Sequence, residues 1–169
     1  MFRRDPLADP EPLIKRVYAY AAYRLGDGPD AEDVTSETFE RALRYRKSYD
    51  PRKGEPVAWL LGIAKRCIDG SWQKTEYATE DLDAVDTRDL EEETVRRLTI
   101  SRAVAVLDER DRELIALRYG ADLTARQIAE LLGARTNAIE VALHRALGRL
   151  RGILGVDEDE PVRKRGASR

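Results

Sequence analysis

The stretch Asp122–Arg151 restricts the fold of this chain more than any other, because it has the pattern of two helices joined by a tight turn. Thr124, followed by Gln127, has the spacing of a capping box at a helix start. Gly133 supplies the positive φ that helix ends favour, and a second helix is expected from about Thr136 to Leu154. A short helix, a glycine turn and a longer helix are typical of a helix-turn-helix, whose second helix enters the DNA major groove.

The same pattern also occurs in a plain αα-hairpin of a helical bundle, so the rest of the chain has to decide between the two. The second helix carries an apolar stripe at the helical period, which we expect to be buried: Ile139, Leu143, Ala146, Leu150 and Ile153. We find no strand pattern and no internal repeat. The sequence therefore predicts an all-α protein.

Charge is segregated along the chain although the formal net charge is only −2. Residues 27–40 contain six acids and no base, whereas residues 41–73 contain eight bases against three acids. Residues 74–100 are again acidic, with nine acids against four bases. Blocks of alternating sign indicate separate surfaces for different partners rather than one basic coat for nucleic acid.

Several function classes lack their signature in this sequence. One cysteine and one histidine cannot form an intrachain disulfide or a His/Cys zinc site. There is no glycine-rich phosphate loop, no nucleophile elbow and no apolar run of membrane-spanning length. We therefore expect a non-enzymatic cytoplasmic protein with no membrane insertion, no catalytic residue, no metal and no cofactor.

The N-terminal half is expected to form three helices, over about 12–25, 31–45 and 56–72. Asp30 is a suitable N-cap for the second of them, and Leu43 is expected on its buried face. The loop Lys47–Glu55 separates the second and third helices, since Pro51 and Gly54 mark turns there. Core packing is expected for Trp59 and Trp72, with base stacking as the alternative for each.

The C-terminal half is expected to add helices over about 99–107, with Ile100 buried, and 111–119. The predicted organisation is a mobile arm at 1–10, a helical domain at 11–73, a linker at 74–98, a helix-turn-helix domain at 99–154 and a disordered tail at 155–169. The fold class is thus two small helical domains, a three-helix bundle and a helix-turn-helix, joined by a flexible acidic linker.

Two pairs of segments resemble one family. AEDVTSETFERAL, followed by AWLLGIAKRCIDG, resembles region 2 of bacterial RNA polymerase sigma factors of the extracytoplasmic-function (ECF) subfamily. LDERDRELIALRYGADLTARQIAELLG, followed by ALHRALGRLR, is similar to region 4 of the same family. The resemblance covers roughly residues 11–73 and 99–154, in the family's order.

The resemblance implies a transcription initiation factor that binds core RNA polymerase, directs it to promoter DNA and helps open the duplex. Region 2 would contact the polymerase clamp and the minus-10 element, and region 4 the flap and the minus-35 element. An anti-sigma factor is a further partner that the family leads us to expect. Opening needs no ATP, because stacking and hydrogen bonds to a captured base offset the free energy of unpairing.

Carried over by position, the resemblance assigns three sets of residues. The core-polymerase-binding set is acidic and polar, as a surface facing a basic coiled coil should be: Asp33, Ser36, Glu37 and Glu40. The minus-10 set combines phosphate-binding bases with Tyr49, the loop's only aromatic residue, as a stacking candidate: Tyr49, Arg52, Lys53, Lys65, Arg66 and Asp69. The minus-35 set is Arg126, Arg135, Thr136, Asn137, Glu140, His144 and Arg145.

The sequence also departs from the family pattern. Arg66 replaces the usual Asn, and Ser71 and Trp72 replace a basic pair. Glu140 and Ala142 stand where the family usually has bases, whereas Arg145 matches the family. Glu140 is either a reader of cytosine N4, the interpretation we favour, or a repulsive surface charge.

Two other functions remain as alternatives. A stand-alone helix-turn-helix regulator would need neither the acidic second helix nor the loop Lys47–Glu55. A sigma-like interaction decoy that no longer binds DNA is supported only by Glu140 and Ala142. The acids of the second helix could also be an ordinary solvated face. An enzyme has no nucleophile, base pair or metal cluster to support it.

Overall fold

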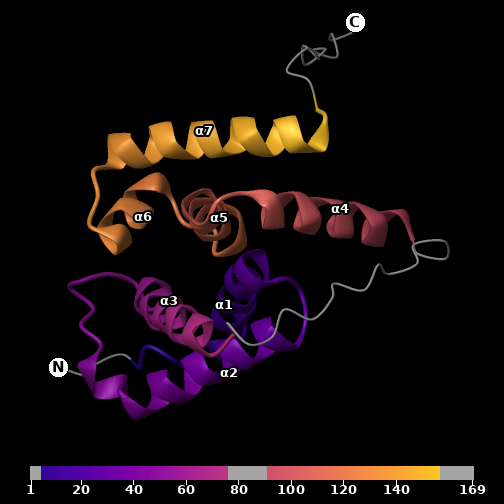
Figure 1. Cartoon of the computed structure of the whole chain (residues 1–169). Coiled ribbons are helices and arrows are strands. Elements are labelled where there is room, and N and C mark those ends of the chain that lie inside the picture. Colours follow the sequence, from indigo (N-terminus) through magenta and orange to yellow (C-terminus); the bar gives the residue numbers. More distant parts are fainter. Residues whose placement is uncertain (1–4, 76–90, 157–169) are drawn as a thin grey trace, which may run out of the picture.

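The computed structural model describes residues 5–75 and 91–156, with no side chain described in 71–75. The described residues are helical and contain no strand. The elements are α1 (Pro10–Leu25), α2 (Pro29–Arg44), η1 (Arg46–Ser48), α3 (Pro56–Thr75), α4 (Glu92–Val106), α5 (Glu109–Ile115), η3 (Ala116–Gly120), α6 (Ala125–Leu132) and α7 (Thr136–Leu154). They form two layers, residues 5–75 below and residues 91–156 above in Figure 1.

The N-terminal layer, residues 5–75, is built by α1, α2 and α3 packing on one another. Their apolar residues recur at the helical period and bury one side of each helix. Two buried threonines of α2, Thr35 and Thr38, donate their hydroxyl protons to the carbonyls of Ala31 and Val34 at 2.7 Å, so neither hydroxyl is left unsatisfied.

The C-terminal layer, residues 91–156, contains the helix-turn-helix that the sequence predicts. The Thr124 side chain accepts from the Gln127 backbone N–H while the Gln127 side chain accepts from the Thr124 backbone N–H, which confirms the capping box. Gly133 ends α6 at φ 65°, and α7 then begins at Thr136 as expected. Both ends of the turn are therefore fixed by local chemistry.

A wider turn joins α5 to the helix-turn-helix. The Ala121 backbone N–H donates to the Ala116 carbonyl at 2.9 Å, so residues Ala116–Gly120 form the π-helical turn η3. Asp122 follows with φ 56°, a left-handed conformation that aspartate tolerates better than most residues. This turn places Gly120 against the backbone of α1.

The two layers share one apolar core. Val17 of α1 and Leu60 of α3 belong to the same buried cluster as Leu117 of η3 and Ile128 of α6. The most extensive contact between the layers is that of η3 with α1, and α6 also contacts α3 through Leu131. A smaller cluster of Val104, Leu107, Ile115 and Ala146 lies in the C-terminal layer, and Tyr23 of α1 packs against it. In the described structure the two predicted domains thus pack as one unit, which the periodicity of single helices could not indicate.

The sequence-based boundaries need several corrections. The α4 helix begins at Glu92, inside the predicted linker, and Ile100 on it is 42% exposed rather than buried. Leu43 of α2 is 60% exposed although its neighbour Ala42 is fully buried, so Leu43 lies outside the core-facing side of the helix. Gly28 and not Asp30 is the N-cap of α2.

The predicted termini and linker are only partly within the described structure. At the N-terminus Pro6 is buried and Asp5 pairs with Arg46 at 3.2 Å, so this part of the predicted mobile arm is anchored. The α1 helix begins at Pro10 rather than Pro12. Most of the predicted linker and tail, residues 76–90 and 157–169, lies outside the described residues.

Candidate nucleic-acid and protein interfaces

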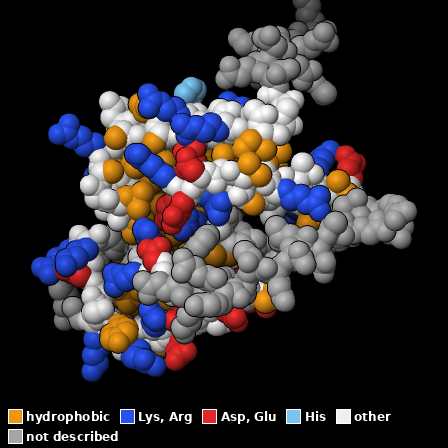
Figure 2. Space-filling model, viewed as in Figure 1, with side chains coloured by type: hydrophobic (Ala, Val, Ile, Leu, Met, Phe, Trp, Pro, Cys, Tyr) orange, Lys and Arg blue, Asp and Glu red, His pale blue; other side chains and the backbone are white. Residues whose placement is uncertain are grey.

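The N-terminal half of α7 is exposed on the outer side of the C-terminal layer, facing away from the N-terminal layer (Figure 1). Figure 2 shows Lys and Arg side chains gathered along this side of the molecule. All seven residues of the predicted minus-35 set are exposed, including Glu140 and Arg145. Six of them lie at the start and along one half of α7, whereas Arg126 lies on α6 and pairs with Glu130 at 3.2 Å.

A buried acid that the sequence analysis missed positions this helix. Asp111 of α5 is 5% exposed and forms an ion pair with Arg149 of α7. The pairing raises the pKa of the Arg149 guanidinium, because Asp111 accepts its hydrogen bond. An ion pair with one buried partner fixes how α7 lies on α5, and therefore which residues α7 presents outward. The two residues are far apart in sequence, so no local pattern indicates the pair.

The loop between α2 and α3 is held by its own side chains. The Tyr49 hydroxyl donates to the Gly54 carbonyl at 3.0 Å, and the Tyr49 ring lies 5.5 Å from that of Trp59. Tyr49 is 9% exposed, so in this structure it offers no free face for a stacked base. The stacking role of Tyr49 thus stays a prediction, while in this structure the burial of its ring against Trp59 stabilises the loop. Trp59 is half-buried, in keeping with core packing.

Asp50 and Arg52 form a second set of hydrogen bonds within the same loop. The Asp50 carboxylate accepts from both the backbone N–H and the guanidinium of Arg52, each at 3.0 Å. These hydrogen bonds lower the pKa of Asp50 to about 2, so its carboxylate stays ionised at neutral pH. Arg52 and Lys53 are exposed and remain on the loop surface.

A pocket of about 680 Å³ opens beside this loop. Most of its lining comes from the loop itself, including Tyr49, Lys53 and Gly54. Two carboxylates from elsewhere complete the rim: Asp5 from the N-terminal segment and Glu130 from α6. The pocket therefore lies at the boundary between the two layers.

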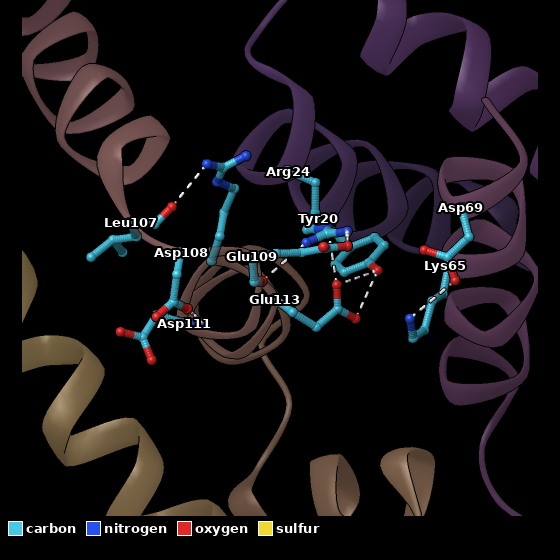
Figure 3. A network of polar contacts seen from close by, with 10 residues as sticks. Tyr20, Arg24, Lys65, Asp69, Leu107, Asp108, Glu109, Asp111 and Glu113 are labelled. Carbon is cyan, nitrogen blue, oxygen red and sulfur yellow. Dashed lines mark hydrogen bonds and ion pairs between the residues drawn. The ribbon is translucent and has the colours of Figure 1, made fainter. Parts of the chain in front are cut away.

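The predicted minus-10 residues of α3 lie near the same boundary. Lys65 and Asp69 pair with each other at 3.1 Å, one helical turn apart, and Arg66 beside them is exposed. Figure 3 shows the Lys65 and Asp69 side chains on the side of α3 that faces Glu113 of α5. We call α3 residues Lys65, Arg66 and Asp69, together with the loop Ser48–Glu55, the minus-10 surface. The side chain of Trp72 is outside the described part of the chain.

The predicted polymerase-binding residues lie on α2, on the side of the N-terminal layer remote from α5, α6 and α7 (Figure 1). Asp33, Ser36 and Glu40 are exposed, and Glu37 is half-buried. Glu37 pairs with Arg41 at 2.6 Å and Glu40 with Arg44 at 3.2 Å, so the face is a ladder of ion pairs rather than purely acidic. Such i,i+4 pairs on a solvated helix stabilise only weakly, so their partners can be exchanged.

Two large apolar side chains adjoin this face and were not expected there. Leu43 and Tyr45 are 60% and 56% exposed, just beyond the ion-pair ladder of α2.

Within residues 5–75 and 91–156 no helix is both long and apolar enough to cross a membrane. The same described ranges contain no group of acidic, histidine or cysteine side chains that could hold a metal ion.

Comparison with known proteins supports the assignment of both layers. Residues 11–75 match the family Sigma-70 region 2, and residues 97–150 match Sigma-70, region 4. The ECF RNA polymerase sigma factor SigK of Mycobacterium ulcerans is 30% identical over 155 residues, which cover 82% of this chain and 80% of SigK. The chain is an ECF sigma factor of the sigma-70 family. The two matches also fit the boundaries of the structural layers.

A second relative of this sigma factor agrees. The ECF RNA polymerase sigma factor BldN of Streptomyces coelicolor is 29% identical over 150 residues, covering 83% of this chain but only 57% of BldN. The sigma factor thus spans little more than half of the length of BldN.

Two solved structures share the fold of this sigma factor. RpoE of Bartonella quintana, in complex with the anti-sigma factor NepR, superposes with a TM-score of 0.69 at 20% identity, over 86% of this chain and 93% of RpoE. CnrH, in complex with the cytosolic domain of CnrY, superposes with a TM-score of 0.60, also at 20% identity, over 87% of this chain and 82% of CnrH.

Proposed function

We propose that this sigma factor binds core RNA polymerase, directs it to promoters and helps open the DNA, without catalytic activity or a cofactor of its own. The observation that carries the proposal is the separation of an exposed recognition helix, α7, from an exposed ladder of ion pairs on α2, on opposite sides of the molecule (Figure 1). A protein that bridges DNA and a polymerase needs two such surfaces. A cytoplasmic location follows from that role.

The α2 ladder serves as the clamp-binding surface. A basic partner can exchange with Arg41 and Arg44 for the carboxylates of Glu37 and Glu40 without unfolding the helix. The adjoining Leu43 and Tyr45 supply the apolar contact area that an ionic surface lacks. The charges then set the rate and salt dependence of association, and the apolar pair lowers the dissociation rate.

The minus-10 surface captures unpaired DNA. Lys53 and Arg66 are exposed and suit phosphate contacts, while the pocket beside the loop is the candidate site for a flipped base. In this scheme Tyr49 shapes the pocket wall through its bond to Gly54. Arg52 is pre-oriented by Asp50.

The N-terminal half of α7 reads the minus-35 element. Asn137, Glu140 and His144 lie at exposed positions from which side chains can reach base edges. Arg135 and Arg145 suit phosphate contacts, and the C-terminal layer also provides the surface for the polymerase flap. An anti-sigma factor that binds this chain is a further expectation, supported by the complexes of the two similar structures.

The test is a run-off transcription assay with purified core enzyme on a promoter library, with co-purification of core as a first step. The proposal requires a stable complex with core and promoter-dependent transcripts. Failure to bind core in the absence of any inhibitor contradicts it. Duplex binding by a chain that does not bind core instead supports the alternative of a stand-alone regulator.

The decoy is the second alternative, and Glu140 on the recognition helix is the observation that favours it. It predicts binding to core without promoter-dependent transcripts. The two assays together therefore separate a sigma factor, a regulator and a decoy.

A further inference from the structure

The interface between the two layers contains a buried polar cluster beside the shared apolar core (Figure 3). The Tyr20 hydroxyl of α1 lies 2.9 and 3.0 Å from the two carboxylate oxygens of Glu113 on α5. Arg24 of α1 forms an ion pair with the same carboxylate, Nε to Oε2 at 2.9 Å. The Arg24 side chain is 2% exposed and that of Glu113 is 10% exposed, so the cluster is sealed from water.

Further contacts join α1 to the start and end of the same C-terminal segment. Arg24 donates to the Glu109 carbonyl at 3.3 Å, at the first turn of α5. Arg16 donates to the carbonyls of Ala121 and Asp122, at 2.7 and 3.1 Å, just after η3. Two arginines of α1, Arg16 and Arg24, therefore hold the start of α5 and the end of η3. The acceptors of these hydrogen bonds are backbone carbonyls, which remain when a side chain of the C-terminal layer is substituted.

This packing brings acids of the C-terminal layer to the edge of the minus-10 surface, while Arg52, Lys53 and Arg66 stay exposed. Burial raises the pKa of the Glu113 carboxyl, and the charges of Arg24 and Lys65 oppose that rise, which places Lys65 within electrostatic reach of Glu113. Glu130 of α6 lines the loop pocket, and Leu131 of α6 lies 3.9 Å from where a Cβ of Gly62 would stand. A carboxylate at the pocket rim repels DNA phosphates.

The two DNA-reading surfaces are thus in different states. The reading residues of α7 are exposed with the layers packed, and so is the α2 ladder. Only the minus-10 surface lies at the boundary between the layers, facing acids of the C-terminal layer (Figure 3).

The packed layers are also too short to read both promoter elements together. The minus-10 and minus-35 elements are about 25 base pairs apart, or about 85 Å at 3.4 Å per base pair. A compact chain of 169 residues has a radius of gyration of about 15 Å and thus a diameter of about 40 Å. A fully extended stretch as long as residues 76–90 adds at most about 50 Å. Both elements are therefore within reach only once the layers have separated.

We propose that Tyr20, Arg24 and Glu113 form a latch that holds the free sigma factor closed, with its minus-35 helix exposed and with the pocket and Lys65 of its minus-10 surface held against acids of the C-terminal layer. The inference rests on the proposed function, since it assigns a state to the surfaces defined there. In the closed state the chain binds minus-35 duplex. Capture of minus-10 single strand requires the latch to open.

The test compares DNA binding by the free full-length chain with and without the latch. Glu113→Gln keeps the size of the side chain but removes the charge that pairs with Arg24. We expect it to bind a minus-10 single-stranded oligonucleotide about 10-fold more tightly than the parent, the factor expected if about one tenth of the parent is open. Binding of a minus-35 duplex should not change. Fluorescence anisotropy at fixed salt measures both.

Asp111→Asn is the matched control. Asp111 is likewise a buried carboxylate of α5 paired with an arginine, but its partner Arg149 belongs to the same layer. It should leave the affinity for the single strand as in the parent. An equal gain in both variants would mean that general loosening, and not the latch, exposes the surface, and this would overturn the proposal.

A reversible lock tests the same idea without destabilising the chain. Gly62→Cys and Leu131→Cys face each other across α3 and α6, in a background where the buried Cys67 is replaced by Ala. Joined by a reducible thiol crosslinker, this chain should neither bind the single strand nor support run-off transcription until reductant is added. If the locked chain transcribes as well as the reduced one, the latch is refuted. If the parent itself fails to transcribe with core, the proposed function fails instead.

Discussion

Glu140 carries the sharpest question at the scale of single residues, because it is an exposed carboxylate among the DNA-reading side chains of α7. A carboxylate repels phosphate but can accept a hydrogen bond from cytosine N4. These two roles have opposite consequences for binding.

If Glu140 reads a cytosine, Glu140→Ala should cost about 1–3 kcal/mol on the cognate minus-35 duplex and relax one base position. The measurement uses the full-length chain and a set of duplex variants at fixed salt, because the two layers share a core. A uniform gain in affinity across every duplex would instead identify a repulsive charge and strengthen the decoy.

Tyr49 makes a second prediction, since its hydroxyl rather than its ring face is what the loop uses. Tyr49→Phe keeps the ring against Trp59 but removes the bond to the Gly54 carbonyl, at a cost of about 0.5–1.5 kcal/mol in loop stability. Affinity for minus-10 single strand should fall several-fold in a background with the latch removed. Tyr45→Phe, at a 56% exposed position nearby, is the control. Unchanged affinity in Tyr49→Phe would restore the stacking role.

At the scale of elements, α2 and η3 illustrate two kinds of surface. The α2 ladder is solvated and its ion pairs are exchangeable, so its charges act at long range. The η3 turn packs against α1 at Gly120, where there is no room for a side chain. Substitutions on the two elements should therefore differ in what they change, association in one case and stability in the other.

Reversing the charge of Asp33 and Glu37 together should weaken core binding several-fold at low salt, and less at high salt, while leaving the helical content intact. Reversing Glu37 also places a cation beside Arg41, its present partner. The matched control reverses Glu92 and Glu93 in the first turn of α4. Equal core binding by the α2 variant and the parent at moderate salt would mean that α2 is only a solvated face.

Gly120→Ala should destabilise the packed chain by about 1–3 kcal/mol, as overpacking does. A Cβ at Gly120 would lie 2.9 Å from the carbonyl oxygen of Ala19, which is backbone and cannot move aside. Gly148→Ala in α7 meets nothing within 4 Å and should stabilise by about 0.5–1 kcal/mol. Urea unfolding of both variants measures the difference, and similar midpoints would contradict the close approach of η3 to α1.

The elements also show which parts of the structure could be predicted from the sequence alone. The helix-turn-helix was predicted correctly because Thr124, Gln127 and Gly133 determine it through bonds within a few residues. The latch was not, because Tyr20 and Glu113 are 93 residues apart and Glu113 has the pattern of an ordinary surface acid. Periodicity identifies the buried side of a helix but not the helix that packs against it. The apolar core shared by the two layers could therefore not be predicted from the sequence.

At the scale of the whole molecule, the shared core changes what limited proteolysis should show. Residues 76–90 are acidic and weakly periodic in sequence, so we expect the first cleavage there. Loaded at about 1 mM, the two fragments should then co-elute on size exclusion, because the apolar core between the layers does not depend on the connection. Separate elution at this loading would show that the layers are independent domains.

The covalent connection between the layers has a consequence of its own for the strength of the latch. A tether of this length keeps its two ends at an effective concentration in the millimolar range. An interface with a dissociation constant of only about 0.1 mM is then closed in roughly nine molecules of ten. After a single cut in residues 76–90 that advantage disappears, and dilution to the nanomolar range suffices to separate the layers. Closure is thus determined by chain connectivity as much as by the contacts of Tyr20, Arg24 and Glu113.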